Sequence, residues 1–198
     1  MALEKKYVPL LVANAAALIG FTAYYLMGGN YEFLVYISVI VFFLAVIYFT
    51  RDKVDYPIPI LWGLSFWAIM HMAGGTFYIG DTRLYDFIFV PLVGEPYNVL
   101  RFDQLIHAFG FGVTTFVAFY LLRPLLKSSA QGSMTIAILL TMVGLGAGGV
   151  NEILEFITTI LSPDTGVGGY INNAVDLVSN VTGAAIAATY IYHRADRM

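Results

Sequence analysis

The sequence predicts an all-α, polytopic membrane protein that forms a single transmembrane domain over residues 1–198. Of the 198 residues, 59% are hydrophobic and only 12% are charged, against about 25% charged residues in a soluble domain. The apolar runs are close to the roughly 20 residues that a membrane-spanning helix needs, whereas membrane β-strands would show alternating runs of about ten residues. The chain has no cysteine, which excludes disulfides, thiolate metal sites and a cysteine nucleophile.

Six apolar runs are the predicted transmembrane helices. They are residues 8–27, 31–50, 57–79, 102–122, 134–161 and 171–192. The first run follows a pair of lysines and ends at a Gly-Gly-Asn connection, and the second ends at the basic connection 51–56. The fourth is closed by 123–133 and the fifth by 162–170. Connections this short indicate that successive helices are antiparallel neighbours in a compact bundle.

The connection between the third and fourth spans, Gly80–Arg101, is the long one. It carries three acidic residues and two prolines among Phe, Leu and Ile. We expect it to lie on or dip into the outer membrane interface. There it either covers the outer end of the bundle as a lid or forms an interfacial hairpin without a function of its own.

Basic residues predict the orientation of the bundle. Eight of the ten Lys and Arg residues fall on one side of the predicted spans, and Arg83 and Arg101 are the exceptions. The eight are Lys5, Lys6, Arg51, Lys53, Arg123, Lys127, Arg194 and Arg197. Because Lys and Arg are enriched in cytoplasmic loops, we expect both termini in the cytoplasm and a multi-pass protein of the plasma membrane.

Polar residues of the last four spans gather in their outer halves. This set consists of His71, Asp103, His107, Asn151, Glu152, Glu155, Asn172, Asp176 and Asn180. Within each helix the members are mostly three or four residues apart, so they share one face. A charged side chain at mid-depth costs roughly 2.5–3.5 kcal/mol on insertion scales. We therefore expect these faces to point into the bundle and to meet in one pocket.

Three kinds of chemistry fit this pocket. Nitrogen and oxygen ligands without thiolate suit zinc, iron or manganese, although the spacing matches neither H-E-x-x-H nor E-x-x-H. A divalent metal is thus one cofactor that the residues would accept, and the sequence does not decide on it. Metal-free acid–base chemistry is the second, with His107 oriented by Asp103 or by a carboxylate across the bundle. The third is binding of a cation, a proton or a polar head group.

Other interpretations of the same residues are structural. Hydrogen bonds between Asn, Asp, His and Glu can simply hold a bundle together. The polar residues stop in the outer half of the spans, which argues against a channel or transporter. Gly144 and Gly148 form a G-x-x-x-G that favours close helix packing. No strand precedes these glycines and no P-loop lysine follows them, which argues against a phosphate-binding loop.

Three short elements resemble those of VanZ-like membrane proteins. Asp103-Gln-Leu-Ile-His107, followed by Ala-Phe, is similar to their D-x-x-x-H-F element. Glu152-Ile-Leu-Glu155 stands where those proteins carry E-x-x-Q, and Asp176-x-x-x-Asn180-x-x-Gly resembles their D-x-x-x-N-x-x-G. VanZ-like proteins are associated with glycopeptide resistance, which by analogy implies cell-envelope or lipid-linked chemistry.

The resemblance to the YjdF-type prokaryotic membrane proteins of unknown function is closer, and it covers about Trp67–Ala188. Those proteins resemble this chain in His71-x-x-Gly-Gly and in carrying E-x-x-E. Their last element has aspartates four apart, whereas the first of that pair is Asn172 here. They also carry a basic residue between the glutamate and aspartate elements, which has no counterpart here. The resemblance implies a plasma-membrane protein with an outward-facing polar site.

These observations predict an envelope enzyme that acts on a lipid or lipid-linked head group, with Glu155 or His107 as base and Asp103 and Asp176 as orienting or metal-binding groups. The alternative is a non-enzymatic subunit, or an ion- or head-group-binding protein, whose polar cluster is mainly structural. The sequence alone does not decide whether the chain is an enzyme. Expected partners are membrane lipids and either protein subunits or further copies of the chain, and no nucleic acid.

The predicted site residues fall into two groups. The candidate catalytic residues are His71, Asp103, His107, Glu152, Glu155 and Asp176. The candidate binding residues are Asn151, Asn172, Asn180 and, from the long connection, Asp81.

Overall fold

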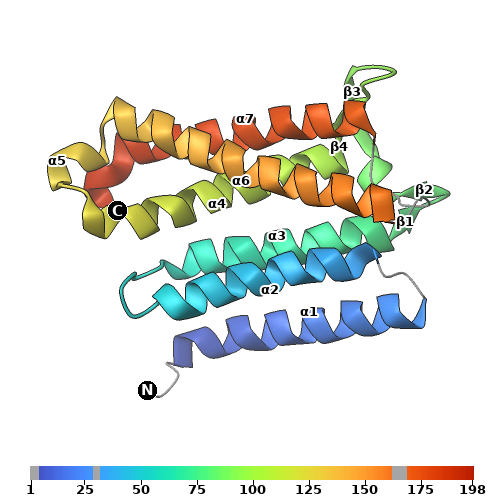
Figure 1. Cartoon of the computed structure of the whole chain (residues 1–198), viewed down its shortest axis with the longest axis horizontal. Helices are drawn as coiled ribbons and strands as arrows, with labels where there is room; N and C mark the ends of the chain where they lie inside the picture. The colour runs from blue at the N-terminus through green and yellow to red at the C-terminus, as the bar shows by residue number, and fades with distance from the viewer. Residues whose placement is uncertain (1–4, 29–31, 162–168) are drawn as a thin grey trace.

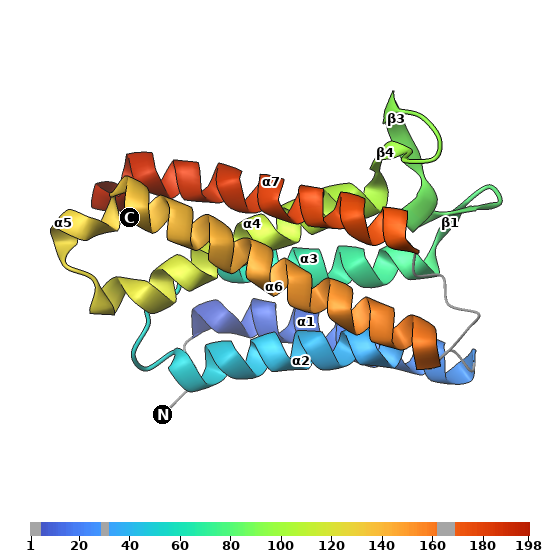
Figure 2. The ribbon, with the colours of Figure 1, turned by 45° about the horizontal axis from the view of Figure 1, so that its top comes forward.

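The computed structural model describes residues 5–28, 32–161 and 169–198. In these ranges, long helices lie side by side along one axis of the molecule (Figure 1). They are α1 (Val8–Met27), α2 (Glu32–Thr50), α3 (Ile58–Thr76), α4 (Phe102–Leu122), α6 (Met134–Leu161) and α7 (Tyr170–Arg194). Short helical turns complete them: η1 (Lys5–Tyr7), η3 (Arg123–Leu125), α5 (Ser128–Gln131) and η4 (Ala195–Arg197). η1 and the C-terminus lie at the end of the bundle that carries α5 (Figures 1 and 2).

Five helices in the described ranges are long and apolar enough to cross a membrane: α1, α3, α4, α6 and α7. In α2, the apolar helical stretch is the shorter Ile40–Thr50. Tyr31, where the second span was predicted to begin, lies outside the described residues. The chain thus has the architecture of a polytopic membrane protein, and the predicted second span, residues 31–50, stays a prediction.

Most helix ends coincide with the ends of the apolar runs. α1, α4 and α6 begin and end at the predicted residues. α7 extends beyond the predicted 171–192 at both ends. α3 ends at Thr76, before the predicted Ile79, because Phe77 is already extended at φ −94° and ψ 156°. The chain then turns at Gly80, whose φ of +61° favours glycine.

The long connection folds into two β-hairpins, which the all-α prediction missed. β1 (Tyr78–Ile79) pairs antiparallel with β2 (Thr82–Arg83), and β3 (Ile88–Val93) pairs antiparallel with β4 (Val99–Arg101). The single turn η2 (Leu84–Asp86) joins them. The Ile-Phe-Val run and the Gly-Glu-Pro turn favour strands and a reversal for ordinary reasons of propensity. Figure 2 shows the β3–β4 hairpin standing out sideways from the bundle near the start of α7.

Glycines allow close contact among α4, α6 and α7. The most extensive helix interface joins α4 to α7, and the next joins α6 to α7. A Cβ on Gly183 of α7 would overlap the backbone carbonyl of Ala108 in α4. A Cβ on Gly144 of α6 would overlap Thr115 and Ala184. The predicted packing role of the G-x-x-x-G is confirmed at this position.

Apolar layers fill the bundle below the polar residues. Phe119, Leu140 and Ile191 are almost completely buried and belong to one large cluster. A second buried layer contains Trp67 and Phe111, and its rings contact the two histidines of the predicted site. α1 and α2 join α3 through a smaller cluster that includes Tyr25, Ile40 and Met72. The predicted site is therefore packed against buried apolar side chains on the side that faces the α5 end of the bundle.

Candidate functional site

The site begins where the β4 strand passes into α4. The side-chain carbonyl of Gln104 accepts hydrogen bonds from the backbone N–H groups of Leu100, at 2.6 Å, and Arg101, at 3.0 Å. Such a contact from the third helical residue satisfies donors that the helix start leaves free. Leu100 has a φ of +82°, which costs a non-glycine residue of order 1–3 kcal/mol. The cap fixes the start of α4 and thereby the direction of Asp103 and His107.

His107 is the centre of the site and is only 1% exposed. Its Nδ1 lies 3.1 Å from Asn180 Oδ1 and 3.2 Å from Glu152 Oε1. Its Nε2 lies 3.5 Å from Asp103 Oδ1 and 3.8 Å from Glu155 Oε1. Residues of α4, α6 and α7 thus surround one imidazole, and each ring nitrogen faces a carboxylate.

Two carboxylates of α6 reach His107 from the same helix face. Glu152 and Glu155 are each 5% exposed. Asn151 donates a hydrogen bond of 2.7 Å to Glu155 Oε1, and Asn180 donates one of 3.3 Å to Glu152 Oε1. Gly148, one turn earlier, leaves room for Asn180, because a Cβ there would lie 2.8 Å from the Asn180 Cβ.

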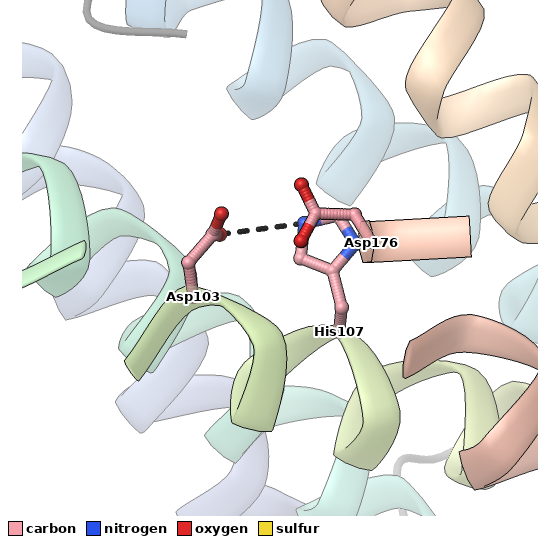
Figure 3. A group of neighbouring side chains, drawn as sticks. All are labelled: Asp103, His107 and Asp176. Carbon is pink, nitrogen blue, oxygen red and sulfur yellow. Dashed lines mark ion pairs between the residues drawn. The ribbon is translucent and has the colours of Figure 1, made fainter. Parts of the chain in front are cut away.

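The polar stripe of α7 completes the cluster. Asp176 and Asn180 are fully buried. Asn172 donates hydrogen bonds to Asp103 Oδ2, at 3.2 Å, and to Asp176 Oδ2. Figure 3 shows Asp103 reaching from α4 toward the imidazole of His107, with the Asp176 carboxylate beside them. Asn172 and Asn180 therefore bond to neighbouring helices, and Asp176 lies between them on the same face, as a four-residue period predicts.

His71 lies at the edge of the cluster. Its ring centroid is 6.2 Å from that of His107 and 5.6 Å from that of Tyr85. The Tyr85 hydroxyl donates a 2.5 Å hydrogen bond to the backbone carbonyl of His71. The Tyr85 ring occupies the space that a side chain at Gly74 would need. The η2 segment of the long connection is thereby held against α3, next to the site.

The cluster contains more acidic than basic groups. Four carboxylates belong to it: Asp103, Glu152, Glu155 and Asp176. Among the described residues, His107 is the only basic group within 4.0 Å of these four carboxylates. Arg101, at the start of α4, instead pairs with Asp86 at 3.2 Å. Burial of negative charge without compensation is unfavourable, so this cluster requires protons or a bound cation.

An open hollow of about 450 Å³ adjoins the cluster, and we call it the vestibule. It is lined by Pro96, Tyr97, Arg101, Gln104, Gly169, Tyr170, Ile171 and Asn172. Asn172 lines the vestibule and also bonds to Asp103 and Asp176. The side chain of Asn172 therefore connects the vestibule to the buried acids.

The structure brings nine of the ten predicted site residues together, in the half of the bundle nearer the hairpins, as the shared helix faces predicted. They are His71, Asp103, His107, Asn151, Glu152, Glu155, Asn172, Asp176 and Asn180. Asp81 is exposed between β1 and β2, and in the described part of the chain no hydrogen bond or ion pair links it to the cluster. A binding role for Asp81 has no support from its position.

Three residues near the site were missed by the sequence interpretation. Arg101 was noted only as an exception to the charge rule, and an isolated basic residue on the acidic side could have indicated a site. Gln104 lies three residues after the helix cap, which is a recognisable signal. Tyr85 carried no local signal, because its contact with α3 is set by tertiary packing.

Two groups of side chains have the geometry to hold a metal ion. Asp103, His107 and Asp176 each offer a ligand atom within 4.8 Å of the others, and His107, Glu152 and Glu155 do the same. Both groups share His107, so one ion would use one of the two arrangements. Without a metal, the same imidazole and carboxylates are placed to exchange protons.

The chain matches a known family of membrane proteins over almost its whole length. The family described as "Predicted membrane protein (DUF2238)" matches residues 8–197. The chain belongs to the DUF2238 family. The match includes α1 and α2, which the resemblance over Trp67–Ala188 had left aside. Membership in DUF2238 is consistent with the similarity to YjdF-type proteins and confirms an integral membrane protein. No curated protein and no solved structure matches the chain.

Proposed function

We propose that this DUF2238 protein is an envelope enzyme of the plasma membrane that acts on a lipid or lipid-linked head group from the outer side. One observation carries the proposal: both nitrogens of a buried histidine face carboxylates, in a cluster that borders an open vestibule. General acid–base catalysis requires such groups within hydrogen-bond reach of one another. Burial of His107, Glu152, Glu155 and Asp176 also keeps water away from most of these groups.

The vestibule supports an anionic head group as substrate. Arg101 lines it, with its Nη1 3.2 Å from Asp86 Oδ1. A guanidinium binds phosphate and carboxylate groups through paired N–H donors. The volume of the vestibule falls within the roughly 300–1,000 Å³ of small-molecule sites. The exposed rings of Tyr97 and Tyr170 at its rim suit the membrane interface, where tyrosine is enriched.

Proton transfer is assigned to Glu155 or His107. Glu155 Oε1 lies 3.8 Å from His107 Nε2, so both groups could exchange protons with the same bound substrate. Asp103, Asp176 and Asn172 orient the imidazole or the substrate from the vestibule side. A relation to VanZ-like proteins would agree with envelope chemistry and forms part of this proposal.

The proposed topology has six spans with both termini in the cytoplasm. It is supported by the eight basic residues in the termini and in the connections 51–56 and 123–133. Figure 1 has the α2–α3 and α4–α6 connections at the same end as the termini, opposite the hairpins. The positive-inside rule then places the vestibule outside.

The test uses the full chain reconstituted in vesicles of phosphatidylethanolamine, phosphatidylglycerol and cardiolipin, with added polyprenyl phosphate or pyrophosphate. Mass spectrometry follows the loss of each lipid and the formation of products. We expect turnover by the wild type, a decrease of roughly 10²–10⁴-fold for Glu155→Gln, and no decrease for Glu95→Gln, which makes the same change on the exposed hairpin. Equal lipid composition with wild type and Glu155→Gln would refute action on these lipids.

A non-enzymatic role is the second candidate, because the same cluster also connects the helices. Hydrogen bonds of Asn172 and Asn180 join α7 to α4 and α6. If the cluster is mainly structural, Glu155→Gln lowers thermal stability while the vesicle lipids stay unchanged with every variant. Co-purification of a stoichiometric partner chain would favour a subunit.

A further inference from the structure

Three polar atoms of the cluster are buried without a hydrogen-bond partner. They are His107 Nε2, Glu152 Oε2 and Asp176 Oδ1. An unsatisfied buried polar group costs about 1–3 kcal/mol, and more when it is charged. More than nine-tenths of buried polar groups in proteins have a partner. Three such atoms on one histidine and its neighbours therefore indicate a ligand-binding centre.

The orientation of His107 selects Nε2 as the ligand atom. Nδ1 lies against two acceptors, Asn180 Oδ1 at 3.1 Å and Glu152 Oε1 at 3.2 Å. Nδ1 therefore carries the proton, and the lone pair of Nε2 points to the other side, where Asp103 Oδ1 lies 3.5 Å away. Metal-binding histidines show this arrangement, in which the second ring nitrogen donates to a carboxylate or carbonyl oxygen that fixes the ring.

The three ligands lie close enough for one ion to draw them together. Bonds from zinc to nitrogen or carboxylate oxygen are about 2.0–2.2 Å, so two ligands of one ion lie roughly 3–4 Å apart. Asp103, His107 and Asp176 offer ligand atoms within 4.8 Å of one another, and a bound ion would shorten these distances by up to about 1 Å. Figure 3 shows the three side chains facing a common point from α4 and α7.

The second group, with Glu152 and Glu155, is less available. Asn180 and Asn151 donate hydrogen bonds to the Oε1 atoms of these two glutamates. Glu152, like Asp176, keeps one oxygen without a partner, but its Oε1 lies 3.2 Å from His107 Nδ1, the nitrogen that carries the proton. A dication neutralises the two aspartates, whose negative charge burial disfavours, and leaves Glu152 and Glu155 to be compensated by protons.

We propose that Asp103, His107 Nε2 and Asp176 coordinate a divalent metal ion of the zinc, iron or manganese class. These are the ions that nitrogen and oxygen ligands without thiolate favour. The inference deepens the proposed function and uses the same site. With Nε2 on the metal, His107 is a ligand, and Glu155 is left as the group that accepts a proton. Asn180 and Glu152 become positioning residues, since they hold the imidazole through Nδ1.

The test measures metal binding by the full chain in detergent, purified with a tag that contains no histidine. The protein is treated with chelator, desalted and titrated with Zn²⁺ or Co²⁺. Bound metal is counted by mass spectrometry, and the visible absorption of Co²⁺ reports its ligands. We expect about one tightly bound ion per wild-type chain. We expect a loss of affinity of at least tenfold for Asp176→Asn and Asp103→Asn, and none for Asp52→Asn, an exposed position at the opposite end.

Asp176→Asn keeps the shape of the side chain, and gel filtration with thermal unfolding checks that each variant is folded. The proposal is overturned if wild type and the Asp103→Asn/Asp176→Asn double variant bind equal metal. It is also overturned if Glu152→Gln and Glu155→Gln remove the ion while Asp176→Asn retains it. Asn180→Leu should weaken binding about 10–100-fold, as loss of a positioning partner does.

The two proposals fail separately. An ion bound by wild type but not by Asp176→Asn, with no change in any vesicle lipid, supports the metal site and refutes the proposed enzyme for those lipids. Lipid turnover at full rate by chelator-treated, metal-free protein supports the enzyme and overturns the metal site.

Discussion

Gly148→Ala is expected to destabilise the protein and to disturb His107 of α4 through Asn180 of α7. A new Cβ at this position would lie 2.7 Å from Asn180 Cγ and 2.8 Å from Asn180 Cβ, whereas ordinary van der Waals contact begins at 3.4 Å. Asn180 is fully buried, so it cannot move aside without displacing α7. Its bonds to His107 and Glu152 would then lengthen or break.

The magnitude follows from two opposing effects. Overpacking a dense interior costs typically about 1–3 kcal/mol, and a buried polar group that loses its partner costs about 1–3 kcal/mol more. Alanine in place of glycine favours the helix by up to about 1 kcal/mol. The net effect is a loss of roughly 1–5 kcal/mol, and each kcal/mol lowers the unfolding temperature by about 2–4 °C in a chain of this size.

Gly149→Ala is the matched control, because it changes the next residue of the same helix and its Cβ would meet nothing within 4 Å. Thermal unfolding of both variants in detergent, followed by fluorescence and gel filtration, measures the difference. We expect Gly149→Ala to unfold at or slightly above the wild-type temperature. Equal unfolding temperatures for the two variants would refute the close packing of α6 on Asn180.

Three further changes test other contacts. Gly183→Ala should lower the free energy of unfolding by about 1–3 kcal/mol, because its Cβ would overlap a backbone carbonyl of α4. Gly146→Ala is the control, since its Cβ would enter open space, and equal unfolding temperatures of the two variants would contradict the α4–α7 packing. Tyr85→Phe removes a hydroxyl bonded to α3 and should cost about 0.5–1.5 kcal/mol, with faster protease cleavage in residues 78–101 as the readout. Ser65→Ala removes the 2.6 Å bond from Asn14 and should lower stability by about 0.6 kcal/mol, the average for such bonds in membranes; no measurable change would mean that lipid or Leu10 replaces it.

The helices and the composition of the cluster could be predicted because both depend on local spacing. The apolar runs set the helix ends, and four-residue periods such as Asn172, Asp176 and Asn180 set a single face. The partner of each ring nitrogen of His107 could not be predicted. That detail depends on how far α6 and α7 rotate and approach, and glycines such as Gly148 decide it through tertiary contact.

The strands of the two hairpins were missed for a different reason, although an interfacial hairpin was one of the two expected outcomes. Phe87–Val93 is rich in aromatic and β-branched residues, which predict strands, but its apolar character was interpreted only as contact with the membrane interface. β3 is largely exposed and apolar, and its contact with the interface stays a prediction. The contact of Tyr85 with α3 spans 14 residues, and no local pattern encodes it.

The apolar cluster around Phe119, Leu140 and Ile191 has a consequence for the energetics of the proposed enzyme. It lies between the buried acids and the end of the bundle that carries α5. With the acids reached from the vestibule, as proposed, the reaction would draw no free energy from an ion gradient or from the membrane voltage. Its direction would then be set by the concentrations of substrate and product.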